Sequence, residues 1–289
     1  MKIMITGAQG QLGRCLQDAL AGLEHEVIAV GRNDLDITNS GAVLQFSERH
    51  KPQVIINAAA YTAVDMAEAE PDLAFAINAG GVANLVAAAN AVGAFLIHVS
   101  TDYVFDGSSR RPYVETDLVN PLGVYGKSKL AGENEAERAQ RYIIMRTAWV
   151  FSEYGSNFVK TMVKLGRERD KLSVVSDQIG TPTYAGDLAG ALVAVAVAVD
   201  QLENGVYHYC GGEACSWYDF AQEIFDVCAD LSADYVVPTI TPIPTTEFPT
   251  PAKRPAFSVL DGAFLEANAE IEPGAWRDAL RKVCIKALK

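Results

Sequence analysis

The stretch Ile3-Met-Ile-Thr-Gly-Ala-Gln-Gly-Gln-Leu-Gly13 decides the fold, because a short apolar run passes directly into glycines spaced Gly-x-x-Gly-x-x-Gly. The residues that follow, from Leu12 to Leu23, repeat leucine and alanine at helical intervals. Glycine allows positive φ and close backbone approach, and a helix N-terminus offers unpaired N–H groups to a pyrophosphate. We therefore expect a strand, a phosphate-binding turn with cofactor contacts at Gly7, Gly10 and Gly13, and a helix.

The first half of the chain repeats this alternation of strand and helix. Pro71 and Asp72 open an alanine-rich helix that ends near Gly93. The apolar runs that we interpret as strands after Ile3–Thr6 are Val27–Val30, Val54–Ala60, Phe95–Thr101 and Ile143–Val150. Alternation of this kind predicts right-handed crossovers and an α/β fold, a Rossmann-like doubly wound parallel sheet with helices on both faces.

After Trp149 the pattern changes and predicts a second, smaller mixed α/β domain lying over the carboxyl edge of the sheet. Its expected elements are helices at Ser156–Arg169, Ala185–Val199, from Ser216 towards Cys228 and at Pro273–Leu288, and strands at Leu172–Val175 and Val206–Tyr209. Pro238–Pro255 holds six of the twelve prolines, so we expect a loop over a site there. We place a dinucleotide-binding domain at 1–151, completed by about 172–212, and a mainly substrate-binding domain at 152–289.

Composition narrows the classes of protein. The chain has 289 residues, 49% of them hydrophobic, and a net charge of −12, which would repel nucleic acid and anionic membranes. Five cysteines without CxxC spacing argue against disulfides and zinc and predict buried thiols. The N-terminus lacks a signal-peptide pattern and the apolar run Ala189–Val199 is too short to span a bilayer, so we expect a cytoplasmic protein.

Two features bear on the cofactor. The second strand ends Val30-Gly-Arg32, where an NAD site would have an acidic residue for the ribose 2′-hydroxyl, and Arg32 would face a 2′-phosphate instead. We therefore favour NADPH, while Asp34 and Asp36 keep NADH open. Small side chains at Ala58, Ala59 and Ala60 would let a cofactor lie against the backbone; tight core packing is the alternative.

Tyr125 and Lys129 are four residues apart after Asn120-Pro121, so on a helix they share one face. The ammonium would stabilise a phenolate and lower the pKa of Tyr125, which makes the phenol a candidate proton donor. The strand Phe95–Thr101 places hydroxyls at the carboxyl edge of the sheet. Thr101, or alternatively Ser100, would hydrogen-bond a substrate carbonyl. Together these residues indicate reduction of a ketone with a nicotinamide cofactor.

At these residues the chain resembles the extended short-chain dehydrogenase/reductase family, over nearly its whole length. The strings that carry the resemblance are Gly7-Ala-Gln-Gly-Gln-Leu-Gly13, Asn57-Ala-Ala-Ala-Tyr-Thr-Ala-Val-Asp65, Ser100-Thr-Asp-Tyr-Val-Phe105, Tyr125-Gly-Lys-Ser-Lys129, Arg146-Thr-Ala-Trp-Val-Phe151, Asp177-Gln-Ile-Gly-Thr-Pro-Thr183 and Pro249-Thr-Pro-Ala-Lys-Arg-Pro255. The later strings point to members that reduce the 4-keto group of a dTDP-linked 6-deoxysugar for cell-surface polysaccharide synthesis.

The resemblance implies roles for particular residues. The catalytic trio falls on Thr101, Tyr125 and Lys129. Further implied cofactor contacts are Gln11, Leu12, Asp36, Ile37 and the alanines 58–60, and the implied sugar-nucleotide pocket contains Val64, Tyr103, Trp149 and Arg254. Trp149 would stack on a sugar or base and Arg254 would hold a pyrophosphate, with core packing and a solvated surface as the alternatives.

Other readings of the same scaffold stay open. An epimerase would recycle its hydride, and a relative serves as a non-catalytic regulatory subunit of methionine adenosyltransferase. A 4,6-dehydratase is disfavoured because Asp102 is followed by Tyr103 and not by glutamate. Some family members bind magnesium between subunits through an early glutamate, but Cys15 stands there, so we predict no such metal site. A homodimer is an expectation, and structural roles are expected for the four histidines.

Overall fold

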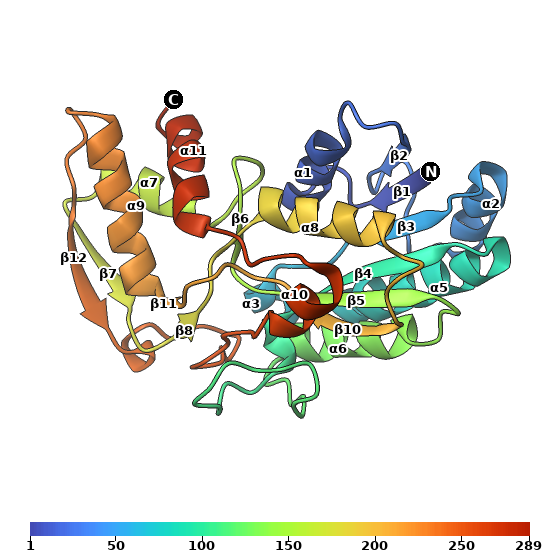
Figure 1. Cartoon of the computed structure of the whole chain (residues 1–289). Helices are drawn as coiled ribbons and strands as arrows, with labels where there is room; N and C mark the ends of the chain where they lie inside the picture. Colours follow the sequence, from blue (N-terminus) through green and yellow to red (C-terminus); the bar gives the residue numbers. More distant parts are fainter.

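Six parallel strands form the central sheet of the computed structural model, which describes residues 1–289 (Figure 1). They are β1 (Lys2–Thr6), β2 (Glu26–Val30), β3 (Val54–Asn57), β4 (Phe95–Thr101), β5 (Tyr142–Thr147) and β10 (Gly205–His208). Their order across the sheet is β10-β5-β4-β3-β1-β2, and every pairing is parallel. The predicted Rossmann-like α/β fold is confirmed.

This strand order reverses direction between β1 and β3, because the chain adds β2 on one side of β1 and β3 on the other. Connections after these two strands run to opposite sides and leave a crevice at their carboxyl ends, the place where doubly wound folds bind ligands. Gly7 follows β1 and Ala58 follows β3. The predicted glycine turn and alanine run therefore meet at the crevice.

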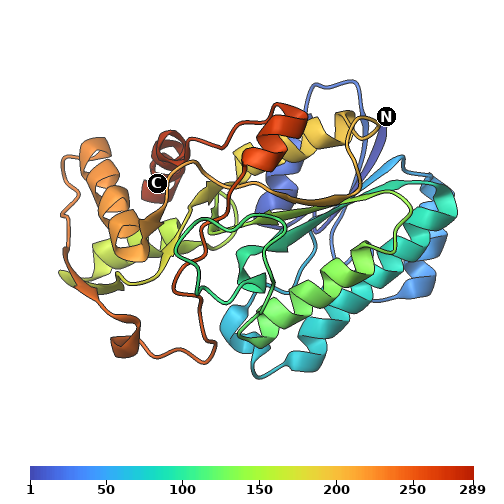
Figure 2. The same ribbon diagram turned by 60° about the horizontal axis from the view of Figure 1, so that its bottom comes forward.

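Helices cover both faces of the sheet, which explains why its strands are almost continuously apolar. On one face α1 (Gln11–Leu20) and α8 (Ala185–Val197) bury leucines and alanines against β1, β3, β4 and β5. On the other face lie α2 (Ser40–His50), α5 (Gly81–Val92) and α6 (Val124–Ala136), as Figure 2 shows. Helix α5 ends at Gly93, as the sequence predicted, and Gly93 forms a left-handed cap with φ 73°.

The apolar helix opened by Pro71 is interrupted. It consists of α4 (Pro71–Phe75), a π-helical turn (Ala76–Gly80) and α5, and the short α3 (Val64–Ala67) precedes it. By length and composition alone the stretch Pro71–Val92 could cross a membrane. In the structure it packs along the sheet between α2 and α6.

A second lobe holds its own apolar core (Figure 1, left). Helices α7 (Phe158–Glu168) and α9 (Trp217–Leu231) pack against the parallel pair β7 (Lys171–Val175) and β12 (Thr239–Ile243), and α11 (Trp276–Leu288) packs on these two helices. The helix that we predicted from Ser216 begins there, and Ser216 forms a capping box with Asp219. Two short pairs, β6 (Val150–Phe151) with β9 (Thr183–Tyr184) and β8 (Ile179–Gly180) with β11 (Cys215–Ser216), and helix α10 (Ala263–Ala269) complete the structure.

Three predicted elements were wrong in extent. The third strand stops at Asn57, because the chain leaves the sheet to form the crevice. The fifth stops at Thr147, because Trp149 has φ 46° and breaks the strand before β6. The proline-rich segment contains β12 as well as a loop, and Pro242 is tolerated there because β12 pairs with β7 alone.

The second half of the chain returns once to the sheet. β10 pairs with β5, and α8 packs on α1. β7, which our predicted return segment included, pairs with β12 in the second lobe instead. The exact division into domains at 151 and 152 stays a prediction.

A buried ion pair fixes α6 to the sheet. Glu133 accepts two hydrogen bonds from Arg146 of β5, at 2.9 and 2.7 Å, and both side chains are almost fully buried. The guanidinium also lies over the Phe105 ring. Because α6 carries Tyr125 and Lys129, this pair sets the depth of the helix that bears them.

We predict that Glu133→Ala lowers the free energy of unfolding by about 3–5 kcal/mol, because it leaves Arg146 buried without its partner charge. Glu135→Ala, in the exposed Glu135–Arg138 pair of the same helix, should cost about 1 kcal/mol or less. Denaturant titration measures both values. Equal losses in the two variants would contradict a structural role for the buried pair.

Candidate active site

A cavity of about 410 Å³ occupies the crevice between β1 and β3. It is lined by Gly7, Gln9, Gly10, Gly31, Arg32, Leu35, Asp36, Ile37, Ala58, Ala59, Ala60, Tyr61, Thr62, Ala63 and Ile77. Eight of the residues predicted to contact the cofactor, namely Gly7, Gly10, Arg32, Asp36, Ile37 and the three alanines, are therefore brought together. Residues from the ends of three strands build this one site.

The glycine turn fits a dinucleotide. Gly7 has φ 69°, and a Cβ there would lie 2.6 Å from the Ala59 nitrogen, so only glycine allows the two loops to approach. Gly10 caps α1 without a side-chain hydrogen bond, which leaves the first N–H groups of the helix available to an anion. A cradle without side chains beside a helix N-terminus suits a pyrophosphate.

The charged residues at the end of β2 have different roles. Asp34 accepts a hydrogen bond from Gly31 N at 2.9 Å and so closes the turn. Asp36 accepts from the backbone and hydroxyl of Thr38, and these bonds hold the pKa of Asp36 below its ordinary value. Arg32 is exposed and lines the cavity. The arginine is thus the group at this edge suited to a 2′-phosphate.

Three further residues that we expected to contact the cofactor, two from the resemblance and Gly13 from the glycine turn, have other visible roles. The Gln11 side chain accepts hydrogen bonds from Ser152 and Asn157, which ties α1 to the start of the second lobe. Leu12 packs on the sheet core. Gly13 allows α1 to approach Gly7 and Ala8 closely. Direct contacts of these three with a cofactor stay predictions.

The proposed catalytic trio comes together where α6 crosses the end of β4. Tyr125 and Lys129 lie on the buried face of α6, and Thr101 ends β4. Lys129 Nζ donates to the Val99 carbonyl at 2.6 Å and faces His98 Nε2 at 3.5 Å. The predicted shared helical face is confirmed.

The expected effect of Lys129 on Tyr125 is wrong in this structure. Burial raises the pKa of Tyr125 to about 12, and the Thr101 hydroxyl opposes this only partly. Burial also lowers the pKa of Lys129 to about 8, because its amine sits inside the protein against Val99 and His98. Tyr125 is therefore firmly protonated at neutral pH, as a proton donor must be.

Thr101 has a hydrogen-bonding arrangement that the sequence did not reveal. Its hydroxyl donates to Asp102 Oδ1 at 2.9 Å and accepts from Tyr103 N at 3.2 Å. Burial raises the pKa of Asp102 to about 6. Because Thr101 has one proton, it can donate to a substrate carbonyl only by turning away from Asp102. The alternative donor, Ser100, has a buried hydroxyl without a partner.

Glu68 positions the catalytic helix from a distance in sequence. Its carboxylate accepts a hydrogen bond from Val124 N at 2.8 Å, at the N-terminus of α6, where the cap residue Gly123 offers no side chain. A negative charge at a helix N-terminus is stabilising. No local motif could have linked these residues, since 56 positions separate them.

The residues implied for the sugar nucleotide lie partly together. Val64 and Tyr103 pack in one cluster with Tyr125, and the two tyrosine rings meet edge to face at 5.4 Å. Arg254 reaches the same side of the site but forms a two-pronged ion pair with Asp65, at 3.0 and 2.8 Å. Arg254 must share or exchange this partner to hold a diphosphate.

Trp149 lies towards the second lobe. Its ring stacks on Trp217 with centroids 3.5 Å apart and packs against Gly180. Trp217 is the first residue of α9, where the sequence indicated only the start of a helix. One face of Trp149 is therefore occupied by protein, and stacking on a ligand there stays a prediction.

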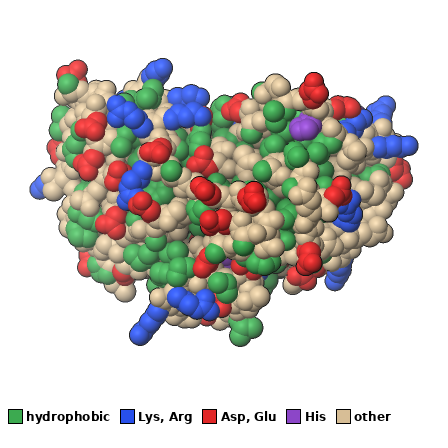
Figure 3. Space-filling view, viewed as in Figure 1, with side chains coloured by type: hydrophobic (Ala, Val, Ile, Leu, Met, Phe, Trp, Pro, Cys, Tyr) green, Lys and Arg blue, Asp and Glu red, His purple; other side chains and the backbone are tan.

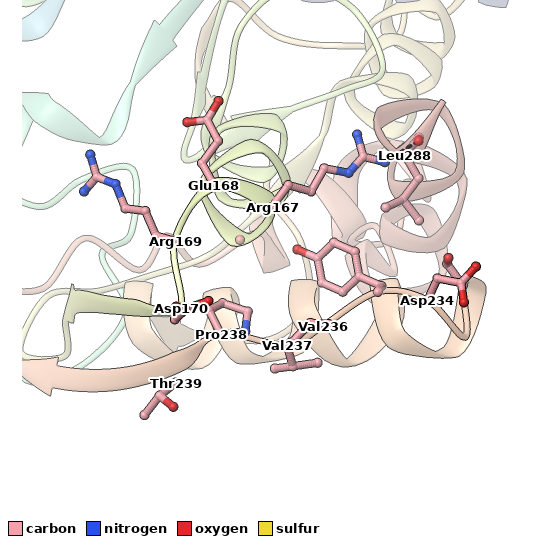
Figure 4. Close-up of a pocket in the computed structure, with 13 residues that line it drawn as sticks. Arg167, Glu168, Arg169, Asp170, Asp234, Val236, Val237, Pro238, Thr239 and Leu288 are labelled. Carbon is pink, nitrogen blue, oxygen red and sulfur yellow. Dashed lines mark hydrogen bonds between the residues drawn. The ribbon is translucent and has the colours of Figure 1, made fainter.

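A larger cavity, about 710 Å³, lies far from these residues in the second lobe (Figure 4). It lies beside the end of α7, the start of β12 and the penultimate residue Leu288, towards which Arg167 points and to whose carbonyl it donates. Arginines and acids alternate in its wall, and it contains none of the predicted site residues. The crevice holds the predicted cofactor contacts and is therefore the candidate site, although its lining contains none of Thr101, Tyr125 and Lys129.

Surface charge and thiols agree with the composition. On the face shown in Figure 3, basic side chains occur in small groups among acidic ones. All five cysteines are free and buried, as predicted. Burial raises the pKa of Cys15 to about 12. No group of three His, Cys, Asp or Glu side chains is arranged to hold a metal ion.

Comparison with known proteins adds a family. The model of the RmlD substrate binding domain matches residues 1–289. A dTDP-4-dehydrorhamnose reductase of Aggregatibacter actinomycetemcomitans is 46% identical over 98% of both chains. The crystal structure of the Clostridium acetobutylicum enzyme of that name superimposes with a TM-score of 0.93 at 47% identity, covering 100% of both chains. The Bacillus anthracis enzyme, solved in complex with NADP, gives 0.90 at 40% identity over 99% of both chains.

We predict that Gly7→Ala weakens NADPH binding at least about tenfold, because the added Cβ would push apart the two loops of the crevice. Gly22→Ala is the matched control: Gly22 has φ 83° but nothing within 4 Å of its Cβ position. Both variants should lose about 1–2 kcal/mol of stability from the left-handed alanine. Fluorescence titration with NADPH measures binding, and unchanged affinity in Gly7→Ala would overturn the cradle.

Proposed function

The chain belongs to the RmlD substrate-binding-domain family, and from this premise we propose that it reduces the 4-keto group of dTDP-4-dehydro-L-rhamnose to give dTDP-L-rhamnose. It is an NADPH-dependent oxidoreductase. The observation that carries the proposal is the meeting of Tyr125 and Lys129 of α6 with Thr101 at the end of β4, the strand next to β3, whose end lines the crevice. We expect NADH to bind less well, because it lacks the 2′-phosphate that Arg32 would contact.

Bound NADPH supplies the hydride that adds to the carbonyl carbon. We assign the proton to Tyr125, whose buried hydroxyl stays protonated until the carbonyl oxygen gains negative charge. Thr101 holds that oxygen by donating its hydroxyl once it turns from Asp102. Lys129, as the ammonium, stabilises the phenolate that Tyr125 leaves behind.

The substrate side of the site is assigned on chemistry. Tyr103 and Val64 flank Tyr125 and would contact the sugar. Arg254 would grip the diphosphate while Asp65 holds its guanidinium in place. Trp149, stacked on Trp217, would border the same pocket from the second lobe.

Consumption of NADPH separates the candidate activities. Given dTDP-4-dehydro-L-rhamnose, the purified protein should consume one NADPH for each product formed, followed by absorbance at 340 nm. Turnover without net NADPH loss would indicate an epimerase. Binding without turnover would indicate a regulatory subunit, and either result would overturn the proposal.

The protein acts on a small nucleotide sugar, and we propose that it does so in the cytoplasm. A homodimer is also proposed, without magnesium between subunits, since Cys15 is a poor ligand for a hard cation. Sedimentation with and without EDTA tests both statements.

We predict that Tyr125→Phe lowers kcat at least about a hundredfold, because the variant loses its positioned acid. NADPH should still bind with little change. Tyr207→Phe provides the control, since it also removes a hydroxyl, bonded to Glu203, from a buried ring outside the crevice. Near-normal turnover in Tyr125→Phe would refute the assignment.

We predict that Arg32→Ala lowers kcat/KM for NADPH about 10–100-fold and barely alters it for NADH, because the lost charge faces only the 2′-phosphate. Arg49→Ala, an exposed arginine on α2, controls for net charge. Steady-state rates with both cofactors give the ratio. An equal loss with both cofactors would show that Arg32 does not recognise the 2′-phosphate of NADPH.

A further inference from the structure

Four buried polar side chains form an unbroken chain from β1 to the catalytic helix. Thr6 Oγ1 donates to Asn57 Oδ1 at 2.7 Å, and Asn57 Nδ2 contacts His98 Nδ1 at 3.0 Å. His98 Nε2 faces Lys129 Nζ at 3.5 Å. All four side chains are nearly or completely buried, so each polar atom must find its partner inside the protein.

A backbone donor fixes the orientation of the Asn57 amide. Ala59 N–H donates to Asn57 Oδ1 at 3.1 Å. If the amide were reversed, its NH₂ group would face this N–H, and two donors would be buried against each other. The Asn57 nitrogen therefore points at His98.

This orientation decides where His98 carries its proton. Because Asn57 donates, His98 Nδ1 must accept, and a neutral imidazole then has its hydrogen on Nε2. That hydrogen points at Lys129 Nζ. Lys129 meanwhile donates to the Val99 carbonyl at 2.6 Å.

We propose that His98 is a positioning residue for Lys129: its Nε2–H faces Nζ, can donate to it only when Lys129 is the neutral amine, and so opposes the ammonium form that the proposed mechanism uses. The proposal rests on the catalytic role of Lys129 given above. This arrangement also connects the cofactor cradle to the catalytic helix. Ala59 lines the cavity, and its N–H orients the Asn57 amide, which in turn determines the tautomer of His98.

The charges around Lys129 agree with this arrangement. Burial, followed by the charge of Lys129, holds the pKa of His98 well below its ordinary value, so the ring is neutral. Glu133, on the same helix, acts on Lys129 in the opposite direction but is itself paired with Arg146. Tyr125, one turn before Lys129 on α6, is neutral at pH 7. The acidic residue at the end of β4 is Asp102, which accepts a hydrogen bond from Thr101.

Nitrogen-15 NMR of the histidine rings tests the proton position directly and does not depend on activity. Spectra of the full chain with NADP, assigned by the loss of signals in His98→Gln, should show a protonated Nε2 and an unprotonated Nδ1 for His98 between pH 6 and 8. The other tautomer, or a doubly protonated ring, would overturn the inference even if the enzyme is the reductase that we propose.

Asn57→Asp reverses the polarity of the chain with almost no change of shape. The carboxylate still accepts from Thr6 and Ala59 but now also accepts from His98 Nδ1–H, so Nε2 becomes an acceptor for the Lys129 ammonium. The pKa of Lys129, about 8 in the unchanged protein, should rise. Activity, which falls as Lys129 loses its proton, should then persist about one pH unit higher.

Asn78→Asp controls for the added charge, since Asn78 is also buried and donates to Ser128 of α6 but has no hydrogen bond to His98. The profile of kcat against pH should shift in Asn57→Asp and stay nearly unchanged in Asn78→Asp. Equal shifts, or none in Asn57→Asp, would contradict the role of His98. If either variant fails to fold, the histidine spectrum of the unchanged protein still decides the question.

Discussion

The close approach of the Gly7 turn to Ala58 and Ala59 is the constraint on which the active site depends. It exists because the strand order reverses between β1 and β3, so the two loops leave the sheet in opposite directions and expose backbone at the crevice. Any side chain at Gly7 would fill that space. The α1 N-terminus, Arg32 and the alanines are useful only because this contact is made without side chains.

The second requirement is a catalytic helix held at a fixed depth. α6 has a glycine cap and little amphipathic character of its own, so its placement depends on distant residues. Glu68 accepts a hydrogen bond from the first turn of α6, and the Glu133–Arg146 ion pair holds its far end. Gly126 and Gly132 let the helix approach Tyr103 and Asn78 closely. These contacts bury Tyr125 and Lys129, and burial moves their pKa values in opposite senses, up for the phenol and down for the amine. A buried acid that stays protonated suits a site that must deliver a proton only when charge develops on the substrate.

Much of this could be predicted from local patterns. The strand-glycine-helix order of residues 3–13 predicted both the sheet and the cofactor crevice, and Tyr125 with Lys129 predicted one helical face. The prediction for the pKa of Tyr125 failed because the spacing places Tyr125 and Lys129 on the same helical face but says nothing of the contacts of the amine. Lys129 Nζ contacts Val99 and His98. Strand ends were missed at Asn57 and Thr147 because apolar residues continue past the point where the chain leaves the sheet.

The sequence by itself determined the α/β architecture, the phosphate-binding turn and the catalytic residue types, because each depends on periodicity or on the spacing of a few neighbours. Only the tertiary structure decided that Arg254 pairs with Asp65, that Trp149 stacks on Trp217 and that His98 is joined to Lys129. Those contacts connect segments far apart in the chain. Their geometry follows from how strands and loops cross, which is a property of the folded sheet and not of any short stretch of residues.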